Sequence, residues 1–316
     1  MEAGKTAAKR GSAAKIITIK RKKMDAAIIG LGLIGGSMAL ELRHTHRYKR
    51  IIGVEANADH ARLALELGLA DEVLPLAEAL RNSSLVVLAV PVNVIAQIVS
   101  QVLDLAGTHA VVIDTGSTKA AICKAAATHS RRGRFVAAHP IAGTENYGPR
   151  AAFRGLFQNK INIVCESEKT DDDALQTAVE IFGQLGMRTV FMPPDEHDRH
   201  LAYVSHLSHV SSFLLGQTVL DIEQNEKHIA MLAGSGFAST VRLAKSSPAM
   251  WAPIFEQNRE YLSQALQEYI IHLQRFQYHL MKGNTAELFN IMRQANEIRR
   301  VLNGISETAT SKTLTP

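Results

Sequence analysis

The stretch A-A-I-I-G-L-G-L-I-G, residues 26–35, decides the fold that this sequence predicts. Its apolar beginning is typical of a buried strand, and a helix-like amphipathic stretch follows the glycines. Gly30 permits a tight turn, Gly32 lets the backbone approach a pyrophosphate, and Gly35 allows a helix to pack closely on a strand. The N-terminus of such a helix offers free N–H groups and a partial positive charge to phosphates. The stretch therefore predicts the turn of a dinucleotide-binding domain.

An acidic residue supports that turn and bears on the choice of cofactor. Glu55 ends the second expected strand, 20 residues after Gly35, where a carboxylate would bind the ribose hydroxyls. A carboxylate there repels a 2′-phosphate, and the next residues, Ala56 and Asn57, supply no arginine to hold one. We therefore expect NAD rather than NADP; a turn that binds nothing and an FAD site are the weaker alternatives. Further cofactor contacts are expected at Leu33, Ile34, Val90, Pro91 and Thr115.

Short apolar runs typical of strands alternate with helix-like runs from Met24 to Pro194. This alternation predicts an α/β Rossmann-type domain over residues 24–194, with a parallel, doubly wound sheet and helices on both faces. The expected strands lie at 26–30, 51–55, 85–90, 110–114, 135–139, 161–165 and 188–192. The expected helices run to about Arg43 and over 58–67, 93–105, 118–128 and 171–185.

The pattern changes after Pro193-Pro194. From there apolar residues recur at helical spacing and no convincing strand is found. We expect an all-helical domain over residues 195–303 and a disordered tail over 304–316. Because a helical domain with this much apolar surface commonly packs on a copy of itself, we also expect a homodimer. The expected helices lie at about 196–224, 227–246, 252–281 and 284–302.

The basic charge of the sequence belongs to its first residues. The 35 Lys+Arg and 30 Asp+Glu residues give a formal net charge of +5. Residues 1–23 hold eight of the basic residues and one acid, which leaves 27 basic and 29 acidic residues, a net charge of −2, in 24–316. This near-neutral body argues against nucleic-acid binding. We interpret residues 1–23 as a flexible or added leader, with a targeting segment as the alternative.

Composition excludes two further classes of protein. Two cysteines, Cys123 and Cys165, are too few for a disulfide framework or a multi-cysteine zinc site. No apolar stretch reaches the roughly 18–20 residues that a membrane helix needs. We therefore expect a cytoplasmic protein that binds neither nucleic acid nor membrane.

Four segments carry polar residues where a strand end or a helix would ordinarily be apolar. Two of them follow strands and so open into the crevice at the carboxyl edge of the sheet, while the others lie in or near predicted helices. The pKa of imidazole lies near working pH, so His139 beside a nicotinamide would suit proton acceptance in alcohol oxidation, with Ser117 nearby. The segments are D-T-G-S-T-K (114–119), H-P-I-A-G-T-E (139–145), V-S-H-L-S-H (204–209) and R-L-A-K-S-S-P-A-M-W (242–251).

Together with G-L-G-L-I-G-G-S and A-V-P, these segments occur in the same order as in prephenate/arogenate dehydrogenases, which the chain closely resembles over about residues 24–302. The resemblance implies a nucleotide domain joined to an all-helical dimerisation domain, with the active site between them. It also implies NAD(P)-linked oxidative decarboxylation of a cyclohexadienol in tyrosine biosynthesis. Because loss of carbon dioxide drives that reaction, the protein would supply mainly positioning, proton acceptance and charge complementarity.

The resemblance assigns a role to each candidate residue. His139 would accept the C4 hydroxyl proton, and Ser117 would orient that hydroxyl and the imidazole. Arg242 would hold a substrate carboxylate with its planar fork. One departure stands out, since relatives often carry an acid where this chain has Ser239, which puts an arginine–carboxylate gating pair in doubt. The other expected substrate contacts are His209, His206, Glu145 and Trp251.

Simpler interpretations of these residues stay open. His206 and His209 are compatible with ordinary helix histidines, Trp251 with core packing, and Arg242 with a local ion pair. His197 and His200 complete a group of four histidines with 206 and 209, but the group lacks the H-E-x-x-H spacing and a nearby thiolate. We therefore expect no metal.

Three questions of function also stay open. A β-hydroxyacid dehydrogenase that uses Lys245 is an alternative enzyme, and a nucleotide-sensing regulatory protein is an alternative of another class. Within the resembled family, arogenate competes with prephenate as the substrate. We favour prephenate because His209 can donate to a keto-acid side chain, whereas the amine of arogenate would want a nearby carboxylate.

Overall fold

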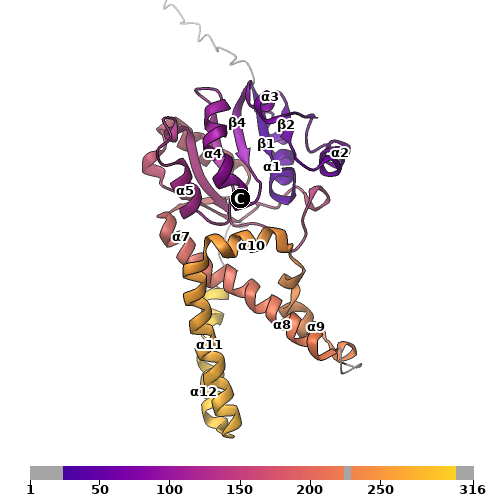
Figure 1. Cartoon of the computed structure of the whole chain (residues 1–316), viewed down its shortest axis with the longest axis vertical. Helices are drawn as coiled ribbons and strands as arrows, with labels where there is room; N and C mark the ends of the chain where they lie inside the picture. Colours follow the sequence, from indigo (N-terminus) through magenta and orange to yellow (C-terminus); the bar gives the residue numbers. More distant parts are fainter. Residues whose placement is uncertain (1–23, 224–228, 304–316) are drawn as a thin grey trace, which may run out of the picture.

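A computed structural model describes residues 24–223 and 229–303 of the chain. An α/β domain forms one end of the molecule, and two helical arms diverge from it (Figure 1). The expected leader, residues 1–23, and the expected tail, residues 304–316, lie outside the described residues. None of the described helices combines the length and the apolar character needed to span a membrane.

The α/β domain is built on one eight-stranded sheet. Its strands are β1 (Asp25–Ile29), β2 (Ile51–Val54), β3 (Glu72–Val73), β4 (Ser83–Leu88), β5 (Val111–Asp114), β6 (Phe135–Pro140), β7 (Ile161–Cys165) and β8 (Arg188–Phe191). Their order across the sheet is β3-β2-β1-β4-β5-β6-β7-β8, and the strands from β3 to β6 pair in parallel. The order reverses between β1 and β4, which is the switch point where such sheets bind ligands beyond their carboxyl ends.

The far side of the sheet differs from the expected all-parallel arrangement. β7 runs antiparallel to β6, with His139 opposite Ile163, and β8 is parallel to β7. The connection from β6 to β7 holds only the single 3-10 turn η2 (Pro149–Ala151), and a parallel return would need a crossover element. Strand direction is set by that connection, so the apolar pattern of residues 161–165 could not reveal it.

Helices cover both faces of the sheet, as the sequence predicts. On one face lie α1 (Leu33–His44), α2 (Ala58–Glu66) and α6 (Asp172–Gln184), and on the other lie α3 (Leu76–Leu80), α4 (Val92–Leu105) and α5 (Ala120–Ala126). Each face has its own hydrophobic core, because the strands are buried on both sides. The short elements β3 and α3 were not expected.

The helical half begins with α7 (Pro194–Leu201), continues through the π-helical turn η4 (Ala202–His206) and ends its first run with α8 (Leu207–Glu223). The expected helix over 227–246 is wrong, because its described residues form three short pieces and Gly234 and Gly236 disfavour a continuous helix. Those pieces are η5 (Ala230–Leu232), α9 (Ser235–Thr240) and η6 (Arg242–Lys245).

The expected helix over 252–281 is divided at the buried residue Asn258. It consists of α10 (Pro248–Gln257) and α11 (Arg259–Met281), and α12 (Thr285–Ala295) follows after a turn at Gly283. α10 packs on α4, so it belongs to the contact between the two halves, while α11 and α12 form one arm and α8 and α9 the other (Figure 1).

Candidate active site

The glycine-rich turn has the geometry that its sequence predicts. Gly30 has φ of +91°, and a Cβ there would lie 2.5 Å from the carbonyl oxygen of Ala89. A Cβ on Gly35 would overlap the carbonyl oxygen of Gly30, so the helix could not approach the strand so closely. Gly32 caps α1, and a Cβ there would meet nothing within 4 Å. The open space above Gly32 and the unpaired N–H groups of the first turn of α1 fit a pyrophosphate.

The candidate cofactor contacts lie around this turn. Leu33 and Ile34 are the first two residues of α1, and Pro91 caps α4 directly after Val90. All four therefore stand at the carboxyl edge of the sheet. Thr115 is also there, but its hydroxyl is buried and donates to the carbonyl oxygen of Leu88 at 3.1 Å.

Glu55 is held in place by the turn itself. Its Oε2 accepts a hydrogen bond from the backbone N–H of Leu31 at 3.0 Å, and its Oε1 accepts one from Asn57 at 3.1 Å. Each carboxylate oxygen keeps a further lone pair. These acceptors lie beside the glycine turn and are of the kind that a pair of ribose hydroxyls would need.

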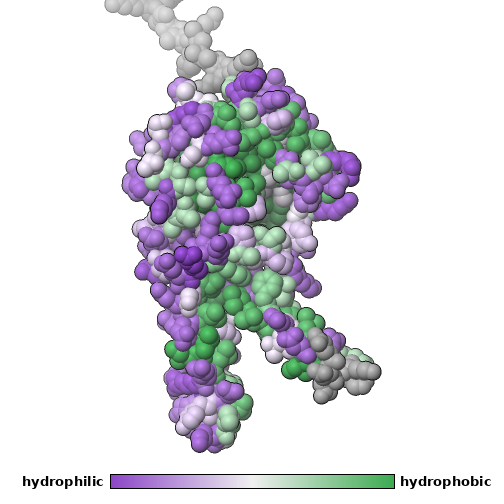
Figure 2. All heavy atoms as spheres, viewed as in Figure 1, coloured by the Kyte–Doolittle hydropathy of each residue, from purple (hydrophilic) through white to green (hydrophobic). Residues whose placement is uncertain are grey.

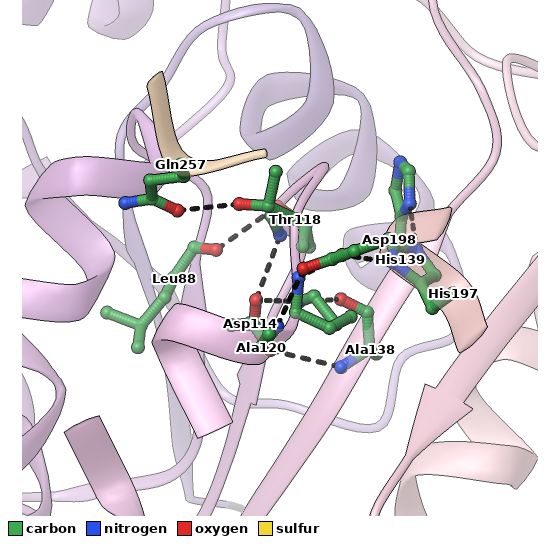
Figure 3. A network of polar contacts seen from close by, with 12 residues as sticks. Leu88, Asp114, Thr118, Ala120, Ala138, His139, His197, Asp198 and Gln257 are labelled. Carbon is green, nitrogen blue, oxygen red and sulfur yellow. Dashed lines mark hydrogen bonds and ion pairs between the residues drawn. The ribbon is translucent and has the colours of Figure 1, made fainter. Parts of the chain in front are cut away.

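His139, at the end of β6, is the first member of a buried chain of polar groups (Figure 3). Its Nδ1 lies 2.8 Å from Nε2 of His197, and Nδ1 of His197 lies 2.7 Å from Oδ1 of Asp198. His197 and Asp198 come from α7, so the chain joins the nucleotide domain to the helical half. The sequence pattern gave no reason to choose these two residues, since their place beside His139 depends on how α7 packs.

The direction of each hydrogen bond follows from the carboxylate. Because a carboxylate only accepts, His197 donates its Nδ1–H to Asp198, and its neutral ring then has an acceptor at Nε2. His139 must therefore donate its Nδ1–H to His197 and keep a lone pair at its own Nε2. Burial first, and then the neighbouring His197, Lys119 and His206, hold the pKa of His139 well below its ordinary value. A neutral imidazole with a free Nε2 is what a general base requires.

A buried ion pair fixes the backbone on which His139 stands. Lys119 is fully buried, and its Nζ donates to the carboxylate of Asp114 and to the carbonyl oxygen of Ala138. Asp114 in turn accepts from the N–H of Ala138 at 3.0 Å. Both polar groups of Ala138 are therefore occupied directly before His139. The segment D-T-G-S-T-K contains this pair, but its spacing does not reveal that the lysine folds back onto the aspartate.

Ser117 lies in the same loop and is half-buried. Among the described residues it has no hydrogen-bond partner, so its hydroxyl is available to a ligand. The orienting hydrogen bond to His139 comes from His197 instead, which differs from the expectation that Ser117 orients the imidazole. The neighbouring Thr118 donates to Oε1 of Gln257 at 2.6 Å and so ties this loop to the end of α10.

Three aromatic rings from the helical half form the next part of the site. His209 stacks on Trp251 with ring centroids 3.4 Å apart, and His206 meets the same indole edge-on at 6.0 Å. His209 donates its Nδ1–H to the carbonyl oxygen of Ser205, and burial lowers its pKa. The neutral ring of His209 therefore has an acceptor at Nε2. Trp251 and His206 are buried and pack together, as the simpler interpretation of both residues allowed.

Arg242 forms an ion pair with a carboxylate, although Ser239 had put such a pair in doubt. The acid is Glu145. The Nη1 of Arg242 donates to Oε2 of Glu145 at 2.8 Å, and both side chains are partly exposed. The backbone N–H of Glu145 and the Arg242 guanidinium lower the pKa of that carboxyl. Ser239 is exposed on α9, and the ion pair does not include it. The contact connects the loop after β6 with η6 in the helical half.

Metal ligands and reactive thiols are not assembled in the part of the chain that the structure describes. No group of three or more His, Cys, Asp or Glu residues there could hold a metal ion. Cys123 and Cys165 are buried, and burial raises the pKa of Cys165 to about 12. The described site thus relies on imidazole, guanidinium and carboxylate groups.

A Rossmann-type domain with a buried neutral imidazole at the junction to a second domain is typical of nucleotide-dependent dehydrogenases. Residues 38–191 match the model of the prephenate dehydrogenase nucleotide-binding domain, and residues 193–294 match the model of the prephenate dehydrogenase dimerization domain. The chain belongs to the prephenate dehydrogenase family.

Individual relatives agree with this assignment. The chain is 30% identical to prephenate dehydrogenase of Bacillus subtilis over 284 residues, which is 89% of this chain and 76% of the relative. It is 31% identical to cyclohexadienyl dehydrogenase of Zymomonas mobilis over 285 residues, 87% of this chain and 95% of the relative.

Among solved structures, prephenate dehydrogenase of Aquifex aeolicus in complex with hydroxyphenyl propionate and NAD+ is similar with a TM-score of 0.80 and 27% identity, covering 90% of this chain and 99% of that one. Arogenate dehydrogenase of Synechocystis is similar with a TM-score of 0.69 and 29% identity, covering 88% and 100%.

Proposed function

We propose that this protein is an NAD-dependent prephenate dehydrogenase, which oxidises and decarboxylates prephenate to 4-hydroxyphenylpyruvate in tyrosine biosynthesis. The observation that carries the proposal is the free Nε2 lone pair of His139 at the carboxyl edge of a nucleotide-binding sheet. Arg242, paired with Glu145 at the entrance, supplies a guanidinium for a carboxylate. The family and the relatives named above support the same activity.

The residues of this chain would divide the work as follows. Ser117 hydrogen-bonds the C4 hydroxyl of the substrate, and His139 accepts its proton at Nε2. Arg242 leaves Glu145 and holds the ring carboxylate with its fork until carbon dioxide is lost. When bound, NAD supplies the acceptor for the hydride from C4. The protein therefore contributes mainly orientation, a base and one matched charge.

NAD is favoured over NADP because of Glu55. Its carboxylate is fixed by two backbone N–H groups, so it cannot easily turn away from a 2′-phosphate. The relative from Aquifex aeolicus was solved with NAD+, which supports the same choice.

Arogenate is a second candidate substrate, and His209 is the observation that favours it. The expected donation from His209 to a keto-acid side chain would require a protonated ring, but its Nδ1–H is used by Ser205 and its pKa is lowered. The acceptor left at Nε2 suits an ammonium group better than a ketone. We therefore expect some activity with arogenate beside that with prephenate.

A β-hydroxyacid dehydrogenase is disfavoured by the lysines of the site. Lys245 is exposed at the end of η6, and Lys119 is fully buried with its ammonium group bound to Asp114 and Ala138. Lys119 is therefore not free to assist a hydroxyacid. A regulatory protein that only senses nucleotide would have no use for the base, Ser117 and Arg242 together.

We further propose a homodimer that forms through the helical arms of a cytoplasmic enzyme. α11 buries only Leu262 and Ala265, α12 buries no residue and α8 buries only Ser212. Hydrophobic residues instead lie on the surface of both arms (Figure 2). The exposed apolar residues there include Leu214, Leu215, Leu220, Ile222, Ile271, Leu273, Phe276, Leu280, Phe289 and Met292. Such a surface needs a partner, and a second copy is the simplest one.

An absorbance assay of reduced cofactor tests the function directly. Prephenate and arogenate are each combined with NAD and with NADP, and the highest kcat/KM is expected for prephenate with NAD. Reduction seen only with a simple hydroxyacid would refute the proposal.

Light scattering coupled to size-exclusion chromatography tests the dimer, which a monomeric mass at micromolar concentration would contradict.

A further inference from the structure

We propose that His197 and Asp198 are positioning residues that hold His139 in the tautomer with a free Nε2 and take up part of the positive charge it gains. This inference rests on the proposed function for its chemistry, but the arrangement itself can be tested without activity. Neither residue belongs to the segments from which the site was predicted.

Burial makes the chain of hydrogen bonds decisive for the tautomer. His139 is 8% exposed, His197 0% and Asp198 2%. Water therefore cannot replace a missing partner, and the Nδ1 of His139 has only Nε2 of His197, 2.8 Å away, as its partner among the described residues. An imidazole whose Nδ1–H must be used in this way cannot also carry its proton on Nε2 while neutral.

Asp198 is itself fixed from both halves of the protein. Its carboxylate accepts from the backbone N–H groups of Lys119 at 2.7 Å and Ala120 at 2.9 Å, at the start of α5 (Figure 3). Its carbonyl oxygen accepts from Nδ2 of Asn258 at 2.7 Å. A carboxylate held by several N–H donors keeps one orientation, so it presents an acceptor oxygen to His197.

The same chain stabilises the charge that forms during the reaction. The substrate hydroxyl proton binds His139 at Nε2, which makes that ring a cation beside the ammonium group of Lys119. The Nδ1 proton can then move onto Nε2 of His197, so that the positive charge lies next to the carboxylate of Asp198 with no net gain or loss of protons. The relay should therefore affect kcat much more than the binding of substrate or NAD.

Two substitutions of His197 separate this role from simple packing. His197→Phe keeps a ring of similar size but removes the acceptor, whereas His197→Gln keeps an acceptor near the Nε2 position but loses the ring. We expect His197→Phe to lower kcat with prephenate about 100-fold, while KM and the Kd for NAD change less than about threefold. The kcat of His197→Gln should be at least about tenfold higher than that of His197→Phe. If His197 only filled space, the order of the two variants would be reversed.

Nitrogen-15 NMR of the histidine rings in the full-length protein gives a readout independent of turnover. In the unsubstituted protein, His139 is expected to show a protonated Nδ1 and an unprotonated Nε2, and in His197→Phe a mixture of tautomers. An unchanged tautomer together with unchanged kcat in His197→Phe would overturn the relay. If the expected tautomer is found but the protein does not oxidise prephenate, the proposed function fails and the positioning role of the relay stands.

Discussion

Arg242 and Glu145, which are 97 residues apart in the sequence, form an ion pair at 2.8 Å that spans the junction of the two halves. The pair is partly exposed, so it contributes little to stability. In the proposed mechanism, a substrate carboxylate competes with Glu145 for the guanidinium of Arg242. The ion pair also holds the guanidinium of Arg242 beside the loop after β6.

Two substitutions should act on this competition in opposite directions. Arg242→Lys removes the fork that pairs with both carboxylate oxygens, so we expect KM for prephenate to rise on the order of 10- to 100-fold with a smaller effect on kcat. Glu145→Gln removes the competing charge and should leave KM unchanged or lower it. Steady-state kinetics at fixed saturating NAD measures both, and a large rise in KM for Glu145→Gln would mean that Glu145 itself binds the substrate.

Substitution of the base should affect turnover and spare the cofactor site. His139→Asn removes the acceptor for the hydroxyl proton, so we expect kcat to fall about 10²- to 10⁴-fold, the range typical of general-base removal. The Kd for NAD, measured by quenching of protein fluorescence, should stay within about twofold. Full activity of this variant would exclude His139 as the base.

The dependence of kcat/KM on pH should reflect the unusual surroundings of His139. The groups facing it are Asp114 and Lys119 from β5 and the loop after it, His197 and Asp198 from α7, and His206 from η4. Burial first, then His197 and Lys119, lower the pKa of His139. The base therefore stays neutral as the pH falls through 6.5, and the acidic limb of the profile should lie well below that value. A limb at or above pH 6.5 would contradict this assignment.

The free energy of unfolding should decrease at acidic pH, because burial keeps these histidines neutral in the folded protein. Burial lowers the pKa values of His139, His197 and His206, that of His206 to about 4, so the folded protein binds fewer protons than the unfolded chain below pH 6.5. By linkage, the free energy of unfolding then decreases as the pH falls from about 6.5 towards 4. The urea midpoint at pH 5 should lie below that at pH 7.5, and His206→Gln should reduce the difference. Equal midpoints in the unsubstituted protein would count against the neutral buried histidines.

Cofactor choice should respond to the charge of Glu55. Glu55→Gln keeps an oxygen acceptor for Leu31 or Asn57 but removes the repulsion of a 2′-phosphate, so we expect the Kd for NADP to fall and the Kd for NAD to rise, each about 3- to 10-fold. Isothermal titration calorimetry with both nucleotides checks this. A variant that still excludes NADP as strongly as the original chain would place the discrimination elsewhere.

The sequence predicts those features of the molecule that depend on residues close together in the chain. The glycine turn, Glu55 and the buried strands follow from short-range geometry, and His139 follows from its place at a strand end. The relay partners His197 and Asp198 could not be found in this way, because only the packing of α7 brings them to β6. The break at Asn258 escaped prediction for a similar reason, since its amide serves Asp198 and His206 while the helical pattern continues through it.

The antiparallel β7 has a consequence for how this site can vary. Because β7 starts at the edge where β6 ends, residues 141–160 begin and finish beside the crevice without crossing the sheet. This segment supplies Glu145 and attaches to α1 through Phe153 and Ser37 and through Gly155 and Glu41. Changes of sequence within it should alter this edge of the sheet while every strand keeps its register. We therefore expect substrate selectivity to change through this segment without disturbing the buried hydrogen bonds of His139, His197 and Asp198.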